Sequence, residues 1–157
     1  MDIDTRSAGA SASLTVIPTG HALGAEVRNV DLKRLDDAAF ATFLRAFHDH
    51  SVLLVRGQTL SDQDLITFSR RFGELDWAPV QESGRRFVEG LPEIYIVSNV
   101  KQNGEPIGSL GAGEAVWHTD MSYLDTPPIA SALYALEIPP AGGNTSCLLY
   151  TSDAADE

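Results

Sequence analysis

Short apolar runs closed by proline or glycine recur along this chain, and only two segments show the helical spacing of apolar residues. Residues 14–32 predict a strand, a turn at Pro18-Thr19-Gly20 and a second strand ending near Leu32. The run SVLLVRG, closed by Gly57, is typical of a buried strand, and EIYIVSN predicts another. The proline-bracketed segment from Ile129 to Ile138 predicts a further strand. The pattern therefore indicates a mixed α and β fold in which strands outnumber helices.

Two amphipathic helices are expected in the first half of the chain. Phenylalanine and leucine residues at helical spacing, preceded by Asp36 as N-cap, predict a helix over residues 37–49. Ser61 and Asp64 resemble a capping box, which predicts a second helix that stops at Gly73.

Composition excludes several classes of function. The chain has 157 residues, 43% of them hydrophobic, which suits one domain or a large part of one. Its net charge of -11 argues against binding to nucleic acid or to an anionic membrane surface. No apolar run approaches the length of a membrane span and no signal peptide is evident, so a cytoplasmic location is expected. The single cysteine, Cys147, excludes an internal disulfide framework and a cysteine-based zinc site.

The segment VWHTDMSY places a histidine two residues before an aspartate. On a strand, residues i and i+2 face the same side, so His118 and Asp120 would present an imidazole and a carboxylate together. These are two of the three ligands in the facial triad of non-haem Fe(II) oxygenases. Taken alone, however, the motif favours a surface histidine that is hydrogen-bonded to a neighbouring aspartate.

The surroundings of this motif change the interpretation. The stretch WHTDMSYLDTPPIASALYALEIPPAGGNT resembles the iron-binding region of the TauD/TfdA (taurine dioxygenase-like) family of Fe(II)/2-oxoglutarate-dependent dioxygenases. GAEVRNVDL, HSVLLVRGQTLSDQDLITFSRRFGEL and the VSN strand resemble the N-terminal half of the same family. The resemblance covers residues 14–146 and implies an α+β, mainly β fold. That fold is a double-stranded β-helix (jelly roll) with flanking helices, incomplete in this chain.

The resemblance also implies roles for individual residues. His118 and Asp120 match the first two iron ligands, and Thr145 matches the threonine that hydrogen-bonds a 2-oxoglutarate carboxylate. Trp117 is expected to pack beside the site as a buried indole, and Ser122 and Tyr123 are expected to pack in the core. The loop from Asn99 to Glu114 would lie where family members cover the substrate, so its glycines suit a mobile lid. In "LLVRGQ", Arg56 and Gly57 match a family signature, and their expected role is structural.

The implied reaction couples oxidative decarboxylation of 2-oxoglutarate by O₂ to hydroxylation of a small organic acid, with Fe(II) as cofactor and ascorbate as a supporting reductant. The primary substrate is not indicated. The expected partners are this small molecule and, for the full-length protein, further copies of itself.

No histidine follows His118 and no arginine follows Arg86, so the third iron ligand and the 2-oxoglutarate-binding arginine of the family are absent. The chain is therefore expected to be an inactive N-terminal fragment of such an enzyme. Two alternatives stay open: a non-catalytic jelly-roll binding module, and a zinc-dependent hydrolase on a cupin-like barrel.

The two ends of the chain are set apart from the dioxygenase-like region, residues 14–146. Residues 1–13 are small and polar and are expected to form a disordered lead-in. Residues 147–157, CLLYTSDAADE, match the translation of a transposase adapter used to build sequencing libraries. We therefore expect this segment to be an artefactual tail that makes few contacts and carries no site.

Overall fold

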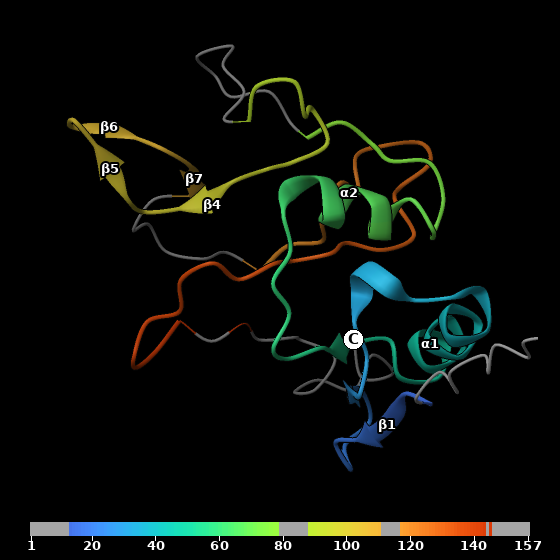
Figure 1. Ribbon diagram of the computed structural model, residues 1–157. Coiled ribbons are helices and arrows are strands. Elements are labelled where there is room, and N and C mark those ends of the chain that lie inside the picture. The colour runs from blue at the N-terminus through green and yellow to red at the C-terminus, as the bar shows by residue number, and fades with distance from the viewer. Residues whose placement is uncertain (1–12, 79–87, 111–116, 144, 146–157) are drawn as a thin grey trace, which may run out of the picture. The chain divides into compact units, whose positions relative to one another are not determined.

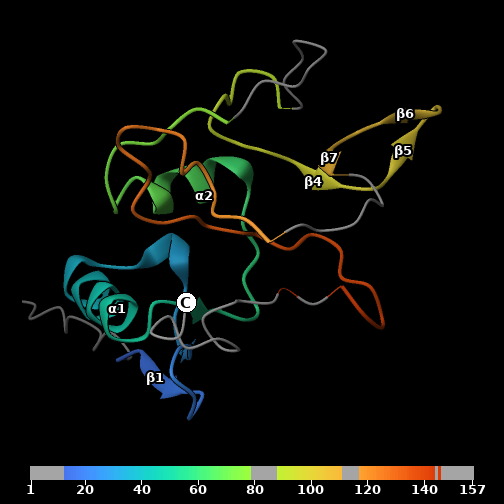
Figure 2. The same cartoon turned by 180° about the vertical axis from the view of Figure 1, so that it is seen from behind.

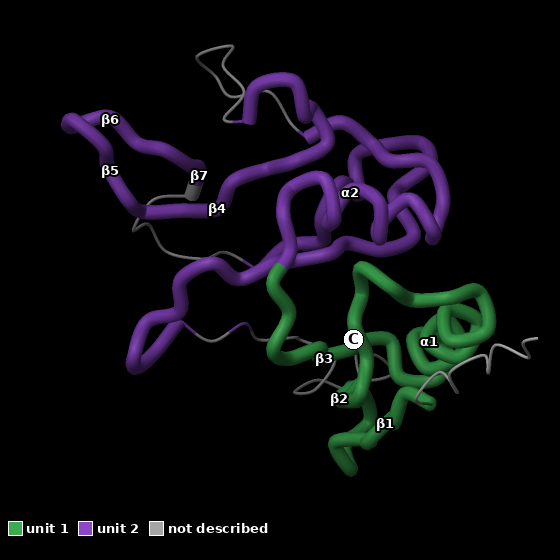
Figure 3. The backbone as a smooth tube through the Cα atoms, viewed as in Figure 1, with its two compact units in different colours: residues 1–59 green, residues 60–157 purple. Residues whose placement is uncertain are grey.

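The computed structural model describes residues 13–78, 88–110, 117–143 and 145 of the chain (Figure 1). By internal contacts the chain divides into two compact units, residues 1–59 and 60–157 (Figure 3). Of the expected lead-in over residues 1–13, only Ser13 is described. The expected artefactual tail over 147–157 lies outside the described residues. None of the helices in the described part is long and apolar enough to span a membrane.

The first unit is a three-stranded sheet covered by one helix. Strand β1 (Thr15–Pro18) pairs antiparallel with β2 (Ala25–Arg28), and β2 pairs parallel with β3 (Leu53–Leu54). A 3-10 turn, η1 (Leu32–Arg34), leads into helix α1 (Asp37–His50), which packs against β2 and β3 (Figures 1 and 2). The strand–turn–strand prediction for residues 14–32 is confirmed, although the second strand ends earlier than expected.

Alternation along β2 places the core of this unit. Ala25 and Val27 are 2% and 1% exposed and face α1, which contributes the buried Phe40, Phe43 and Ala46. Because side chains alternate across a strand, the residues between these positions on β2 face away from α1. Ala25 and Val27 therefore form the surface of β2 against which the amphipathic helix packs.

Local interactions cap both ends of α1, and the cap at Asp36 confirms the sequence prediction. The Asp36 side chain accepts a hydrogen bond of 2.8 Å from the backbone N–H of Ala39. At the other end, Ser51 adopts a φ of 60° and its N–H donates to the Phe47 carbonyl. These caps satisfy backbone groups that the helix itself leaves unpaired. Helix α1 ends at His50, one residue beyond the predicted range of 37–49.

Glu26 lies on the outer face of β2 between two arginines. Its carboxylate is 2.8 Å from Arg28 Nη2 and 3.6 Å from Arg56 Nε. The hydrogen bond from Arg28 is the main cause that lowers the pKa of Glu26 below 4.5. Because the folded-state pKa is lowered, the ion pair adds stability above pH 4.5 and loses it as pH falls through the folded-state pKa. Arg56 thus contacts the sheet, in agreement with the structural role expected for it.

The run SVLLVRG does not form the expected buried strand. Only Leu53 and Leu54 are in β3, and Val52 and Leu54 are 50% and 47% exposed. A fully apolar run is buried on both faces only where elements cover both faces of its sheet. In the described part of the first unit, α1 covers one face.

The second unit begins with helix α2 (Asp62–Ser69), which confirms the capping-box prediction. Ser61 Oγ accepts from the Asp64 N–H, and the Asp64 carboxylate accepts from the Ser61 N–H at 2.9 Å. The helix ends at Ser69, earlier than the predicted stop at Gly73. Near the start of α2, the Tyr134 hydroxyl accepts a 3.1 Å hydrogen bond from the N–H of Leu60, which joins segments 74 residues apart.

The expected loop over residues 99–114 contains ordered β-structure in its described part. Strand β4 (Val97–Ser98) pairs parallel with β7 (Ser109–Leu110), and β5 (Lys101–Gln102) pairs antiparallel with β6 (Glu105–Pro106). Asn103 and Gly104 join β5 to β6 with φ of 54° and 86°, the conformation of a two-residue hairpin turn. The expected loop is therefore partly a β-hairpin in its described residues. Residues 111–116 of the expected lid lie outside the described residues.

No strand forms over Ile129–Ile138, contrary to the prediction. The large apolar side chains of this segment are three-quarters exposed or more, for example Ile129 at 77% and Leu136 at 81%. An apolar segment between prolines does not by itself form a strand, since a strand also needs a neighbouring strand that pairs with its backbone N–H and C=O groups. In the described residues no strand pairs with this segment.

The mixed α and β fold is confirmed, and so is the prediction that strands outnumber helices. Among the described residues seven strands form one sheet of three and two sheets of two, beside two α-helices. The strands are short, at two to four residues, and the α-helices have 14 and 8 residues. The incomplete double-stranded β-helix therefore remains an expectation.

Candidate metal centre

His118 and Asp120 converge in the second unit. Nε2 of the imidazole lies 3.1 Å from Oδ1 of the carboxylate, within ion-pair distance when the histidine is protonated. Both side chains are about two-thirds exposed, at 67% and 66%. The predicted convergence of the two side chains is therefore confirmed, and both groups are accessible to an ion from solution.

The motif lies on irregular backbone that leads into a turn, and not on a strand. Residues 117–119 have no regular secondary structure, and a turn begins at Asp120. Met121 has a φ of 52°, and the N–H of Leu124 donates to its carbonyl at 3.1 Å. The strand expected at this motif is therefore absent, although the two side chains still converge.

The separation of the two donor atoms suits a metal ion. Imidazole nitrogen and carboxylate oxygen each bind such an ion at about 2.0–2.2 Å. At the right angle between neighbouring ligands of an octahedral ion, such distances separate the two donors by about 3 Å. The observed 3.1 Å equals that value, so neither side chain would have to move far. The same distance also fits the simple histidine–aspartate pair that the sequence left open.

The described residues show no third ligand near this pair. No group of three or more histidine, cysteine, aspartate or glutamate side chains that could hold an ion occurs among the described residues. The pair alone could supply two neighbouring ligands of a metal ion, and the remaining ligands would have to come from other groups.

Thr145 follows a sharp turn of two left-handed glycines. Gly142 and Gly143 have φ of 76° and 69°, which other residues adopt only at a cost. A Cβ on Gly143 would also lie 2.9 Å from Cγ of Pro139. Thr145 itself is exposed. A pocket shared by Thr145 with His118 and Asp120 stays a prediction.

The aromatic residues around the motif are not buried. Trp117 is 59% exposed and Tyr123 is 74% exposed, and Ser122 is exposed as well. The predictions of a packed indole and of core roles for Ser122 and Tyr123 were therefore wrong. These residues lie on irregular or turn backbone, so they lack the strand alternation that would bury every second side chain.

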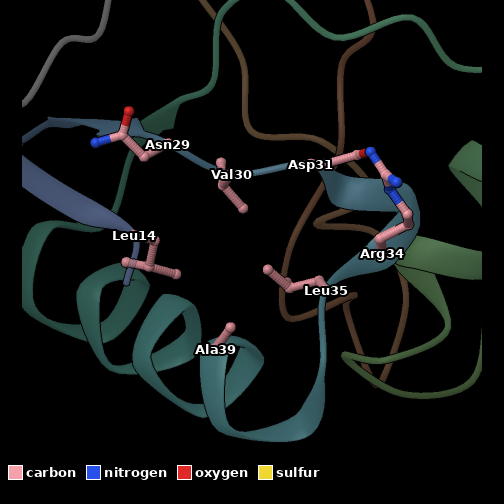
Figure 4. A pocket seen from close by; sticks show the side chains of 7 residues that line it. All are labelled: Leu14, Asn29, Val30, Asp31, Arg34, Leu35 and Ala39. Atoms are coloured by element: carbon pink, nitrogen blue, oxygen red, sulfur yellow. The ribbon is translucent and has the colours of Figure 1, made fainter. Parts of the chain in front are cut away.

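A separate cavity lies in the first unit, away from any residue predicted from the sequence to carry chemistry. It has a volume of about 400 Å³. Figure 4 shows apolar side chains directed into it and one ion pair at its end; these residues are Leu14, Val30, Leu35 and Ala39, with Asp31 and Arg34. Arg34 Nε donates to Asp31 Oδ2 at 2.8 Å. The cavity contains none of the metal-ligating candidates.

Comparison with known proteins identifies the family. The sequence model of the family described as "Taurine catabolism dioxygenase TauD, TfdA family" matches residues 15–148. A relative from Delftia acidovorans, (S)-phenoxypropionate/alpha-ketoglutarate-dioxygenase, is 33% identical over 92% of this chain and 50% of its own length. Pentalenolactone F synthase from Streptomyces avermitilis is 33% identical over 88% of this chain and 46% of its own length.

Two further similarities are of the same kind. The alpha-ketoglutarate-dependent 2,4-dichlorophenoxyacetate dioxygenase of Cupriavidus pinatubonensis is 30% identical over 85% of this chain and 49% of its own length. The solved structure of a taurine dioxygenase from Burkholderia xenovorans is 34% identical, with a TM-score of 0.45 over 53% of this chain and 28% of its own. The chain thus spans about half the length of the curated relatives it matches. Since the family model covers most of the sequence, the chain belongs to the taurine catabolism dioxygenase TauD, TfdA family.

Proposed function

We propose that this chain is part of an Fe(II)/2-oxoglutarate-dependent dioxygenase that hydroxylates a small organic acid. The observation that carries the proposal is the His118–Asp120 pair, whose donor atoms are 3.1 Å apart in a chain of this family. Two relatives are named for phenoxypropionate and for 2,4-dichlorophenoxyacetate, which are aryloxy acids. Their names support a small carboxylic acid as the substrate class.

The donor set fits iron better than zinc. One neutral imidazole and one carboxylate are two members of the 2-His-1-carboxylate triad that holds non-haem Fe(II). A catalytic zinc ion usually has three protein ligands rich in histidine, and the described residues offer one histidine at this position. Bound Fe(II) would supply the oxidative decarboxylation of 2-oxoglutarate by O₂ and the hydroxylation that follows.

The chain's own residues would hold and orient the reactants. His118 Nε2 and Asp120 Oδ1 would fill two neighbouring positions of the ion and leave the opposite side open. The Thr145 hydroxyl would donate a hydrogen bond to a carboxylate of 2-oxoglutarate, a charge-assisted bond that fixes one end of the co-substrate. The exposed glycine turn before Thr145 lets the backbone approach a ligand closely.

Thr145 therefore offers a test that is separate from iron binding. Replacing Thr145 by valine, which keeps the shape and removes the hydroxyl, is expected to weaken 2-oxoglutarate binding roughly tenfold or more, since a hydrogen bond to a charged group is lost. Thr145→Ser is the matched control and is expected to stay near the parent affinity. The measurement is isothermal titration of Fe(II)-loaded protein, extended with its natural sequence beyond Ser146, with 2-oxoglutarate. Equal affinity of the valine and parent proteins would remove Thr145 from the site.

The reaction itself is tested by succinate release. Purified protein extended with the natural sequence beyond Ser146 is incubated with Fe(II), ascorbate and 2-oxoglutarate, beside the 157-residue chain and a Zn(II)-loaded sample. Iron-dependent succinate from the extended protein, with none from the zinc sample, is expected. We expect the short chain to release none, because two ligands do not fix a facial site. Zinc-supported hydrolysis without 2-oxoglutarate, or binding without turnover, would instead favour the hydrolase or the binding module.

A further inference from the structure

The second unit, residues 60–157, buries few apolar side chains in its described part. Those that are buried belong to Ile66 and Phe68 of α2, which are 3% and 7% exposed. A unit of this length usually buries a much larger core. Four large apolar side chains of one short segment are instead exposed by three-quarters or more: Ile129 at 77%, Leu133 at 80%, Leu136 at 81% and Ile138 at 76%. The described part of the unit therefore leaves residues 129–138 without a covering layer.

One residue of this segment shows how it is attached to the unit. The Tyr134 hydroxyl accepts a 3.1 Å hydrogen bond from the N–H of Leu60, shortly before α2, and the tyrosine is half-buried. No strand pairs with the segment in the described residues. If the segment is extended as a strand, Leu133 faces the opposite side from Leu136 and Ile138. Large apolar side chains then need cover on both faces, as in a strand at the centre of a sheet.

We propose that residues 129–138 are the docking surface for the sequence that follows Ser146 in the natural protein, which pairs with this segment and covers its four exposed side chains. The length of the relatives supports this occupant. The chain spans 50% of the Delftia acidovorans relative and 49% of the Cupriavidus pinatubonensis relative, so each contains about as much sequence again outside the match. The inference rests on the part of the proposed function that makes this chain a piece of a longer protein, and not on iron.

A second copy of the chain fits this surface less well. Two such segments paired edge to edge would satisfy backbone groups but leave the same side chains exposed on both faces. Each copy also has a net charge of -11, so self-association would bring two strongly negative chains together. The observations therefore favour the sequence after Ser146 as the occupant.

Hydrogen exchange of the backbone amides in residues 129–138 tests the proposal without metal. The 157-residue chain is compared with the protein extended by its natural sequence beyond Ser146, each at two protein concentrations. Exchange of this segment is expected to be on the order of a hundredfold or more slower in the extended protein, because paired and buried amides exchange only when the structure opens. Equal exchange in the two proteins would overturn the proposal. Protection of the short chain that rises with its concentration would also overturn it, since the occupant would then be a second copy.

A charged substitution distinguishes docking from packing within the chain itself. Leu136→Asp is expected to leave the short chain nearly unchanged, because this side chain is already 81% exposed there. In the extended protein it is expected to speed exchange of the segment roughly tenfold or more, because a carboxylate would be buried without a partner. Thr126→Asp adds the same charge at an exposed position outside the segment and is expected to match the parent.

The two aspartate variants of the extended protein decide the matter if the short chain does not stay in solution. Equal exchange of residues 129–138 in Leu136→Asp and Thr126→Asp would contradict the docking surface. Should Leu136→Asp not fold in the extended protein, Leu136→Ala is compared with Thr126→Ala in the same way, and only the leucine variant is expected to exchange faster than the parent.

These measurements involve neither iron nor 2-oxoglutarate, so they fail separately from the proposed reaction. An extended protein that protects residues 129–138 but releases no succinate would uphold the docking surface and contradict the dioxygenase. Succinate release by an extended protein in which this segment stays unprotected would uphold the dioxygenase and overturn the docking surface.

Discussion

Replacement of Asp120 by alanine is expected to lower the affinity of the protein for Fe(II) on the order of a hundredfold or more. Loss of groups that merely orient metal ligands already costs roughly 10–100-fold in affinity, so loss of a ligand costs at least as much. His118→Ala is expected to have an effect of the same size, since each side chain supplies one of two donors 3.1 Å apart. The measurement is an anaerobic Fe(II) titration of the protein extended beyond Ser146.

Asp125 provides the matched control for this prediction. It is an exposed aspartate in the same segment, five residues after Asp120, with the same charge. Asp125→Ala removes one negative charge from the neighbourhood and leaves the pair intact, so a change of less than threefold is expected from screened electrostatics alone. Equal losses in the two variants would mean that the ion responds to overall negative charge and not to a defined site.

Replacement of Phe43 by alanine is expected to destabilise the first unit by about 3–5 kcal/mol. Phe43 is 4% exposed and faces the buried residues of β2, so the truncation removes apolar contacts and leaves a cavity. Since domains are stable by only about 5–15 kcal/mol, a loss of this size removes a large share of the stability. Urea denaturation followed by circular dichroism gives the free energy of unfolding.

Two variants serve as controls for the destabilisation expected of Phe43→Ala. Phe43→Leu keeps most of the apolar volume and is expected to cost less than about 1.5 kcal/mol. Thr42→Ala, at the neighbouring half-buried position of α1, removes a hydroxyl and little apolar volume, so it is expected to cost about 1 kcal/mol or less. A free energy of unfolding for Phe43→Ala that equals that of Thr42→Ala would show that α1 does not pack on the sheet as described.

The sequence predicted both helices well because their signals are local. Asp36, Ser61 and Asp64 cap helix starts by bonding backbone groups within three residues, and phenylalanines at helical spacing define the buried face. These interactions need no information from distant parts of the chain. The start of α1 was therefore predicted to the residue, and its end to within one residue.

The strands were predicted less well because pairing is not local. The segments SVLLVRG and Ile129–Ile138 have strand-like composition, yet only Leu53 and Leu54 pair with a neighbour in the described residues. Conversely, the polar segment around Asn103 forms a hairpin, because its Asn-Gly turn suits two short strands despite their polar composition. Composition thus indicated where strands were possible, and pairing decided where they formed.

At the candidate site, the sequence predicted that two side chains converge but not the reason for it. The i, i+2 spacing suggested a strand, whereas the two side chains converge from irregular backbone at the start of a turn. The turn contains Met121 at positive φ, for which methionine, unlike glycine or asparagine, gives no sequence signal. Trp117 and Tyr123 are exposed, although large aromatic side chains were expected to be buried.

The most direct test of the metal site is a crystal structure of the extended protein grown anaerobically with Fe(II). The ion is predicted to lie about 2.0–2.2 Å from both His118 Nε2 and Asp120 Oδ1, with the two donors at roughly a right angle. An ion bound elsewhere, or His118 still paired with Asp120 while iron is present at saturating concentration, would contradict the account.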